Sequence, residues 1–147
     1  GYTVIYYCGE VSEFENQPCC RQVAAAEQLA AKPNTYTAFE RALIKAYKFS
    51  QENHGKTIDD VAKYIQIDRE LIETEVYGGY AESVPDPDYL ATRTLKDSVV
   101  EFGYTNDYDL DALYNNDIYK AALESLIAEK PDDAVYLGLL ERFEKAN

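Results

Sequence analysis

The chain has 147 residues, about the length of one typical domain, which is long enough to bury a core and too short for two large domains. With 46% hydrophobic and 28% charged residues, its composition indicates a globular protein and not a disordered one. Because 27 acidic side chains face 14 basic ones, the net charge of -13 opposes binding to nucleic acid or to an anionic membrane, and no apolar stretch approaches the roughly 20 residues that cross a bilayer.

The first part of the chain predicts two strands and a short helix. Residues 2–8 are β-branched and aromatic without a helical period, which favours a strand. Residues 20–23 predict a second short strand that leads into a small-residue helix, residues 24–31, which ends before Pro33. One or two strands cannot form an independent sheet, so we expect their partners outside this sequence or in a second copy. Because the chain starts at Gly1 and contains no methionine, we also expect a piece of a longer or processed protein.

The next segment predicts one long amphipathic helix. Asn34 is suited to the N-cap of this helix, and Gly55 is suited to its stop. Apolar residues recur at spacings near three and four, which predicts a single buried face made of Tyr36, Phe39, Leu43, Ala46, Tyr47 and Phe49.

Two short helices and a proline-containing loop follow. Thr57 and Asp60 resemble a capping box at the start of the first helix. Asp68 is suited to the N-cap of the second helix, which the glycine pair 78–79 ends. Residues 81–88, AESVPDPD, contain two prolines that exclude a helix interior, so we expect a loop or an extended arm.

The last third of the chain predicts three more helices. Asp88 opens the first, and Gly103 stops it. A turn-rich acidic segment leads to a helix over residues 118–129, and Pro131 begins the final helix. The residues expected to face inward are Leu95, Val99 and Phe102 in the first of these helices and Val135, Leu139 and Phe143 in the last.

Residues 56–76 have the helix-turn-helix pattern of some DNA-binding proteins, but their charge excludes that function. The segment carries three basic residues against six acidic ones, including the run DRELIETE. A recognition helix of this kind would place carboxylates against phosphates, so we interpret the segment as a packed pair of helices.

The three cysteines, Cys8, Cys19 and Cys20, are the main candidates for chemistry. A structural zinc site needs about four ligands at spacings such as C-x2-C, whereas Cys19 and Cys20 are adjacent and on a strand would point to opposite faces, so we expect burial. His54, the only histidine, lies at a helix end, where capping is more typical than activation of a thiol. A disulfide from Cys8 to Cys19 or Cys20 stays open. We predict no catalytic residue, no metal site and no cofactor.

Several stretches occur in an order that resembles a known family. A strand, an acidic loop ending in QPCC, a short strand, AAKP and FERALIKAYKFSQEN precede DRELIETEVYGGYAESVPDPD and SVVEFGYTNDYDLDALYNNDIYK. Over essentially the whole chain this order is similar to the C-terminal part of the solute-binding proteins of ABC importers for nitrate, sulfonate, taurine and thiamine-pyrimidine precursors. The resemblance implies an α/β, periplasmic-binding-protein-like (type II) fold. Residues 1–24 would be its last strand and crossover, and residues 25–147 a helical portion packing on the first lobe, with the N-terminal half of the fold absent.

The resemblance also implies a function and a site. The protein would capture a small solute by closure of two lobes and deliver it to an ABC transporter permease, outside the cytoplasm and with a lipid anchor on the full-length protein. A strand-exchanged dimer is an expectation for this piece alone. The crossover loop lies at the edge of the cleft in such folds, so the residues expected nearest the ligand are Glu13, Asn16, Gln17, Cys19 and Arg21.

Two alternatives belong to other functional classes. The first is a self-contained acidic helical module whose VPDPD arm binds a basic partner. The second is an enzyme similar to thiamine-pyrimidine synthases, a eukaryotic relative of the family. That enzyme depends on a longer cysteine-rich run and on histidines, and this sequence departs from the pattern with two adjacent cysteines and one distant histidine.

Overall fold

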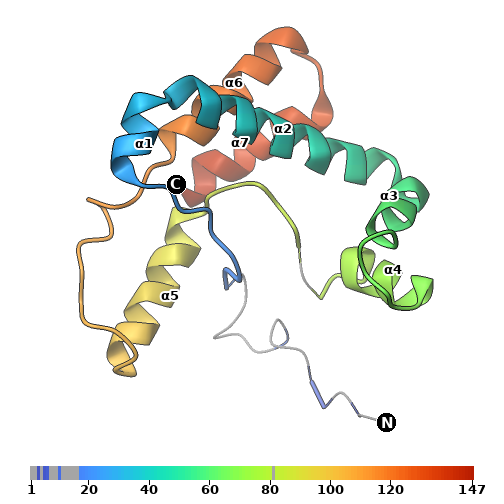
Figure 1. Cartoon of the computed structure of the whole chain (residues 1–147), viewed down its shortest axis with the longest axis horizontal. Helices are drawn as coiled ribbons and strands as arrows, with labels where there is room; N and C mark the ends of the chain where they lie inside the picture. The colour runs from blue at the N-terminus through green and yellow to red at the C-terminus, as the bar shows by residue number, and fades with distance from the viewer. Residues whose placement is uncertain (1–2, 4, 7–9, 11–16, 81) are drawn as a thin grey trace. The chain divides into compact units, whose positions relative to one another are not determined.

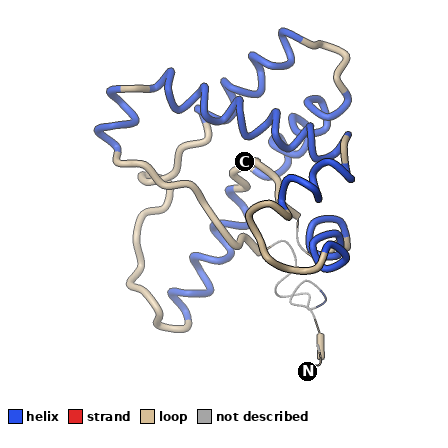
Figure 2. The backbone as a smooth tube through the Cα atoms, turned by 45° about the vertical axis from the view of Figure 1, so that its right-hand side comes forward, coloured by secondary structure: helices blue, strands red, loops and turns tan. Residues whose placement is uncertain are grey.

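The computed structural model describes residues 3, 5, 6, 10, 17–80 and 82–147. Within these residues the chain forms helices and loops and no strand, as Figure 2 shows. It divides into two units, described separately below: one contains Lys45–Pro85, and the other contains Gln17–Ile44 and Asp86–Asn147. The helices, labelled in Figure 1, are α1 (Ala26–Ala31), α2 (Pro33–Glu52), α3 (His54–Val61), α4 (Arg69–Tyr77), α5 (Tyr89–Glu101), α6 (Asp117–Glu129) and α7 (Ala134–Ala146).

The expected α/β, periplasmic-binding-protein-like fold is wrong for the part of the chain that is described, because that part is entirely helical. The second expected strand, residues 20–23, is an irregular segment, and Val23 is 95% exposed. A strand is stabilised by hydrogen bonds to a neighbouring strand, and the described residues supply none. The first expected strand, residues 2–8, falls mostly outside the described residues.

The core of the second unit lies mainly between α6 and α7, an antiparallel pair joined by a short turn at Lys130 (Figure 1). Tyr119 and Phe143 face each other across this pair, with ring centroids 5.7 Å apart. The expectation that Leu139 and Phe143 face inward is confirmed. The buried apolar side chains of α6 and α7 are Tyr119, Ala122, Leu123, Leu126, Tyr136, Leu139 and Phe143.

The start of α7 differs from the expectation by three residues. The helix begins at Ala134, and Pro131 lies in the preceding turn. The Asp133 carboxylate accepts hydrogen bonds from the backbone N–H groups of Val135 and Tyr136, at 3.2 and 3.4 Å. An aspartate at the N-cap position satisfies N–H groups that have no partner inside the helix, so Asp133 sets the boundary.

Both predicted ends of α5 are confirmed. The Asp88 carboxylate accepts from the Ala91 N–H at 3.0 Å, as an N-cap does. At the other end Gly103 has φ of +74°, and the N–H groups of Gly103 and Tyr104 donate to the carbonyls of Val100 and Val99. This pair of bonds is a Schellman motif, which favours glycine at the left-handed position.

The inward face predicted for α5 is only partly correct. Leu95 and Val99 are half-buried, but Phe102 is exposed. None of the residues of α5 is fully buried. Among the described helices, α5 makes close contact only with α7, so much of its apolar face stays at the surface.

The long helix α2 differs from the expectation at both ends. It begins at Pro33, which suits the first helical position because a proline lacks an N–H that would have no partner there. It ends at Glu52, and Gly55, the expected stop, lies inside α3 after a break at Asn53. Arg41 attaches the N-terminal half of α2 to α6 through Ser125 and through Glu129 at 2.7 Å.

The buried face predicted for α2 is also only partly correct. Tyr36, Leu43 and Tyr47 are half-buried, and Ile44, which the prediction omitted, is the one fully buried residue of this helix. The other three predicted residues are exposed. With Ala42, which is exposed too, they form a second apolar stripe at spacings of three and four, called here the outer stripe: Phe39, Ala42, Ala46 and Phe49.

In the first unit α3 and α4 pack against each other and bury Ile58 and Ile72. The His54 and Tyr77 rings stack with centroids 4.0 Å apart, and the Tyr77 hydroxyl donates to the Ser50 carbonyl at 2.8 Å. This packed pair agrees with the interpretation of the segment as two short helices.

The predicted starts of α3 and α4 have different outcomes. Because α3 begins four residues earlier than expected, Thr57 lies inside the helix and makes no capping box. Its Oγ1 is buried without a hydrogen-bond partner among the described residues. Asp68 does occupy the N-cap position of α4, but its side chain makes no capping hydrogen bond.

Candidate functional site

The predicted ligand residues that the structure describes lie in the segment before α1, within the second unit. Glu13 and Asn16 lie outside the described residues. Gln17, Cys19 and Arg21 are all exposed. Of these, Arg21 makes contact with a distant element, so it is the starting point for the site.

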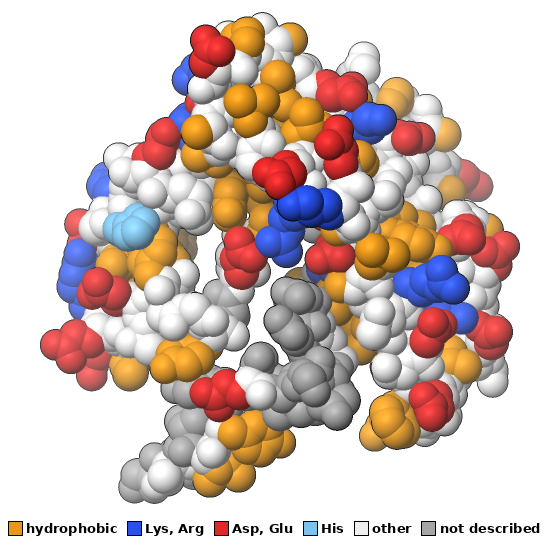
Figure 3. Space-filling view, turned by 180° about the vertical axis from the view of Figure 1, so that it is seen from behind, with side chains coloured by type: hydrophobic (Ala, Val, Ile, Leu, Met, Phe, Trp, Pro, Cys, Tyr) orange, Lys and Arg blue, Asp and Glu red, His pale blue; other side chains and the backbone are white. Residues whose placement is uncertain are grey.

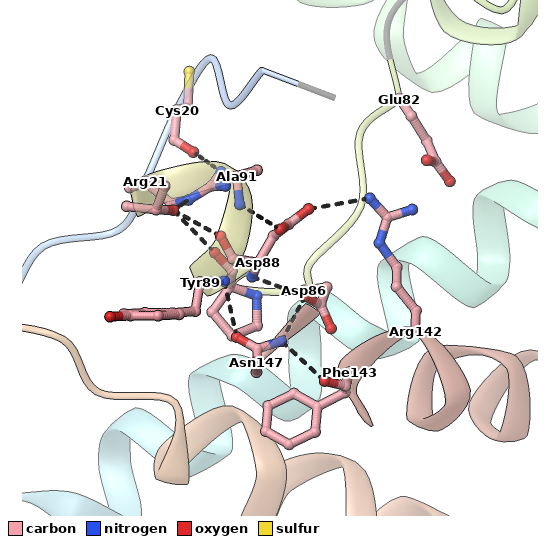
Figure 4. A network of polar contacts seen from close by, with 12 residues as sticks. Cys20, Arg21, Glu82, Asp86, Asp88, Tyr89, Ala91, Arg142, Phe143 and Asn147 are labelled. Atoms are coloured by element: carbon pink, nitrogen blue, oxygen red, sulfur yellow. Dashed lines mark hydrogen bonds and ion pairs between the residues drawn. The ribbon is translucent and has the colours of Figure 1, made fainter. Parts of the chain in front are cut away.

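Arg21 connects the segment to the first turn of α5 (Figure 4). Its Nε donates to Thr92 Oγ1 at 2.9 Å, and its Nη1 donates to the Cys20 carbonyl at 2.7 Å. The Thr92 hydroxyl in turn donates to the Asp88 carbonyl at 2.8 Å. These bonds hold the guanidinium in one orientation, and its Nη2 makes no hydrogen bond within the part of the chain that is described.

The two cysteines beside Arg21 are exposed and free, so the expectation that they are buried is wrong. The Sγ atoms of Cys19 and Cys20 are 3.7 Å apart. The expected opposite orientation required a strand, which is not present at these residues. The hydrogen bond and the charge of Cys20 raise the pKa of the Cys19 thiol, which opposes its use as a nucleophile because the thiolate is the reactive form. Cys8 lies outside the described residues.

A buried carboxylate lies in the loop before α5. Asp86 is only 4% exposed, and its Oδ1 accepts from the Asp88 N–H at 2.8 Å and from Asn147 Nδ2 at 3.1 Å. Its Oδ2 is buried without a hydrogen-bond partner among the described residues. Burial raises the pKa of Asp86, and the hydrogen bonds from Asn147 and Asp88 and the charge of Arg142 oppose that rise.

Asn147 ties this loop to the end of α7, as the dashed lines in Figure 4 show. Its Oδ1 accepts from the Tyr89 N–H at 3.1 Å and from the Tyr114 hydroxyl at 3.4 Å, and its Nδ2 also donates to the Phe143 carbonyl at 3.3 Å. Burial raises the pKa of Tyr114 to about 12, so its hydroxyl stays protonated and can donate. Asn147 therefore satisfies polar groups from three separate segments.

An ion pair completes the arrangement. Arg142 Nη2 lies 3.7 Å from Asp88 Oδ2, while the other oxygen of Asp88 caps α5. The network therefore uses its carboxylates to fix the loop, and Arg21 is the charged group in it that keeps an unused, exposed edge. Chemically this arrangement can orient a cation toward an anionic group; it offers no pairing of a nucleophile with a base.

The sequence predicted only part of this network. Asp88 and Arg21 were identified from capping and from position. Asp86, Arg142 and Asn147 were missed, because the contacts that bring them together, Asp86 with Asn147 and Arg142 with Asp88, join residues more than 50 positions apart in sequence. The one local signal was the alternation of proline and aspartate in residues 84–88, VPDPD, which predicted a loop and not its burial.

A shallow polar depression beside α5 is the second candidate. It lies between α5 and the loop that follows, and Lys96 there pairs with Asp107 and lies 5.7 Å from the ring centroid of Tyr108. Arg93 is 4.0 Å from Asp97, and the Tyr89 hydroxyl donates to Asp111. Because both basic side chains here are already paired with carboxylates, the depression is an exposed ion-pair network.

Metal-binding groups, membrane-spanning helices, surface charge and similarity to known proteins can each assign a chain to a functional class. The described residues contain no group of three or more histidine, cysteine, aspartate or glutamate side chains arranged to hold a metal ion. Across the described part, each helix is too short or too polar to cross a membrane. Acidic side chains are spread over the face shown in Figure 3, interrupted by hydrophobic ones. No protein-family model matches the chain, and neither curated proteins nor solved structures give a match.

Proposed function

We propose that this chain is part of the solute-binding component of an ABC importer and that Arg21 contacts a small anionic solute, such as nitrate, a sulfonate or taurine. The observation that carries the proposal is the fixed guanidinium. Two hydrogen bonds orient Arg21, and its Nη2 edge is left for a ligand. A guanidinium held in this way binds a planar anion or a sulfonate at a lower cost in side-chain entropy than a free one does.

The outer stripe of α2 supports a role as part of a larger protein. Phe39 is 52% exposed and Phe49 is 41% exposed, and both lie on one face of a 20-residue helix. A continuous apolar stripe at helical spacing is typical of a face that packs against other protein. The motif order from QPCC to the acidic tail, which resembles the C-terminal part of such binding proteins, supports the same function.

Capture of the solute in this proposal is binding and not catalysis. The raised pKa of the Cys19 thiol opposes its use as a nucleophile, and the His54 ring stacks on Tyr77. Ligand contacts from this chain and from the rest of the protein would favour a closed arrangement. The permease of the importer would then recognise this closed form outside the cytoplasm.

A ligand panel on the full-length protein tests the proposal. Nitrate, taurine, an alkyl sulfonate and a thiamine-pyrimidine precursor are each added, and the melting temperature is measured. A ligand at 100 times its Kd stabilises the native state by about 2.7 kcal/mol, so at least one should raise the melting temperature. If none does so, the proposed function is wrong.

Two variants locate the contact. Arg21→Gln should lose the shift produced by the active solute, because glutamine carries no charge. Arg93→Gln is the matched control, since Arg93 is an exposed arginine one position from Thr92. If Arg21→Gln keeps the full shift while the wild type responds, solute binding stands and the assignment of Arg21 is wrong.

One observation favours a second function, an acidic helical module that binds a basic partner. The second unit encloses its own core between α6 and α7. Size-exclusion chromatography and circular dichroism of the 147-residue chain distinguish the two functions. A folded, monodisperse monomer would favour the module, whereas aggregation or a dimer would favour a chain that depends on further protein.

A further inference from the structure

The adjacent thiols of Cys19 and Cys20 form a pair that the proposed function does not use together. Both side chains are exposed and both thiols are free. Their Sγ atoms are 3.7 Å apart and point to the same side of the backbone closely enough for a thiol hydrogen bond. The pair is therefore reachable from solvent and both sulfurs are available at once.

The separation of the sulfurs matches the spacing of two ligands on one soft atom. With bonds of about 2.3 Å, two sulfurs on a tetrahedral centre lie roughly 3.8 Å apart, and on a pyramidal trivalent centre, whose bond angles are smaller, they lie a few tenths of an ångström closer. A disulfide, by contrast, would need the sulfurs at about 2.05 Å and is strained between adjacent residues, whose Cα atoms are only about 3.8 Å apart. The geometry therefore favours bridging by a third atom over direct oxidation.

The neighbouring residues limit which kind of atom can bridge the two sulfurs. Among the described residues no third cysteine, histidine, aspartate or glutamate joins the pair in a metal-binding group. A centre that needs four protein ligands, such as structural zinc, does not fit two thiols. An atom that needs only two sulfurs from the protein, and brings its third substituent with it, does fit this pair of thiols.

We propose that Cys19 and Cys20 form a two-thiol binding site for a trivalent, thiophilic metalloid centre, such as a trivalent organoarsenical. The site is independent of the solute-binding function. In the binding step two S–H bonds break and two As–S bonds form at an arsenic oxide, whose oxygen leaves as water with both protons. No oxidant or reductant is needed, because the oxidation states do not change.

The backbone beside the thiols is held in place, which favours two-point binding. Arg21 Nη1 donates to the Cys20 carbonyl and Arg21 Nε donates to Thr92 on α5. Pro18 precedes the pair and fixes its own φ. A segment restrained in this way loses less conformational entropy when both sulfurs are engaged.

Titration of the reduced full chain with phenylarsine oxide tests the site. Intact mass should show one arsenical per chain, and the count of reactive thiols should fall by two. The adduct should survive excess 2-mercaptoethanol and be released by 2,3-dimercaptopropanol. Cys19→Ser and Cys20→Ser should each weaken binding by about 100-fold or more, because the second attachment becomes intramolecular only when both thiols are present.

Cys8→Ser is the control, since Cys8 is the remaining thiol of the chain. This variant should bind phenylarsine oxide as the wild type does. Circular dichroism of Cys19→Ser and of Cys20→Ser should be unchanged, because both thiols are at the surface. Loss of binding in Cys8→Ser, or wild-type binding in either Cys19→Ser or Cys20→Ser, would overturn the proposal.

Discussion

Helices α6 and α2 have similar spacings of apolar residues but differ in how many of their side chains are buried. In α6, 13 residues bury four side chains completely, among them Leu123 and Leu126. In α2, 20 residues bury only Ile44 completely. Both helices carry apolar residues at spacings of three and four, so the difference does not come from the pattern.

The difference in burial comes from the surface that each helix packs against. Helix α6 packs along α7, which supplies Leu139 and Phe143 to the same core. Helix α2 is attached to α6 through the polar contacts of Arg41, which leave the outer stripe uncovered. A hydrophobic stripe stabilises a protein only when another surface removes it from water, so identical periodicity can give very different stabilisation.

The largest predicted effect tests the α6 side of this comparison. Leu123→Ala should lower the free energy of unfolding by about 2–5 kcal/mol, because the lost methyl groups are fully buried and leave a cavity. Urea unfolding followed by circular dichroism measures this change. The control is Leu137→Ala on α7, where the side chain is 43% exposed and a change within about 0.5 kcal/mol is expected. Equal losses at both positions would contradict the burial described for α6.

The next effect concerns how the two helices of the core pair begin. Asp133→Ala should cost about 1 kcal/mol of stability, because it removes the acceptor for two N–H groups at the start of α7. Asn116 occupies the same position before α6 but makes no capping hydrogen bond. Asn116→Ala should therefore have a clearly smaller effect in the same unfolding assay, and the reverse order would show that the caps are assigned wrongly.

A pH-dependent effect tests whether the loop before α5 is held at the end of α7 as described. Burial raises the folded-state pKa of Asp86. A carboxyl group of this kind binds its proton more tightly when folded, so its favourable contribution is present below the unfolded pKa of about 3.9 and is lost as pH rises through the folded value. The unfolding free energy of Asp86→Asn minus that of the wild type should thus increase between pH 3 and pH 7.

Taking the difference between the two proteins is necessary because burial also raises the pKa of Glu40. That group titrates in both proteins, and its effect cancels. A difference that is flat with pH would mean that Asp86 is as well solvated in the folded state as in the unfolded one.

The smallest predicted effect tests the α2 side. In the 147-residue chain Phe39→Ala should change stability by no more than about 0.5 kcal/mol, since this side chain is half-exposed on the outer stripe. Ile44→Ala in the same helix is the control and should cost about 2–5 kcal/mol. Under the proposed function, in which further protein covers the stripe, the cost of Phe39→Ala should rise when that protein is present. A large cost already in the 147-residue chain would refute the exposure of this face.

Sequence reasoning was most successful where structure depends on near neighbours. Asp88 caps α5 and Gly103 ends it, as predicted, because both bonds involve residues within four or five positions. The existence of all the helices from residue 24 onward was also predicted. The start of α3 was wrong by four residues and that of α7 by three, since several polar residues there could act as caps and only packing selects among them.

The prediction of the candidate site was less successful. The position of Arg21 suggested a role, but its contact with Thr92 lies 71 residues away and cannot be inferred from spacing. The α/β fold implied by the resemblance requires strands that the described residues do not form. Strand pairing depends on a second segment, and a short β-branched run cannot specify that segment by itself.

By itself the sequence determined the acidic character of the chain, its helices and several of their ends, because charge and capping depend on composition and on neighbours along the chain. Only the tertiary structure decided which stripe of α2 is buried, why Asp86 is out of water, and which groups Asn147 joins. Those outcomes depend on contacts such as that of Asp86 with Asn147, 61 residues apart, where the free energy of burial is set by the partner and not by the residue alone.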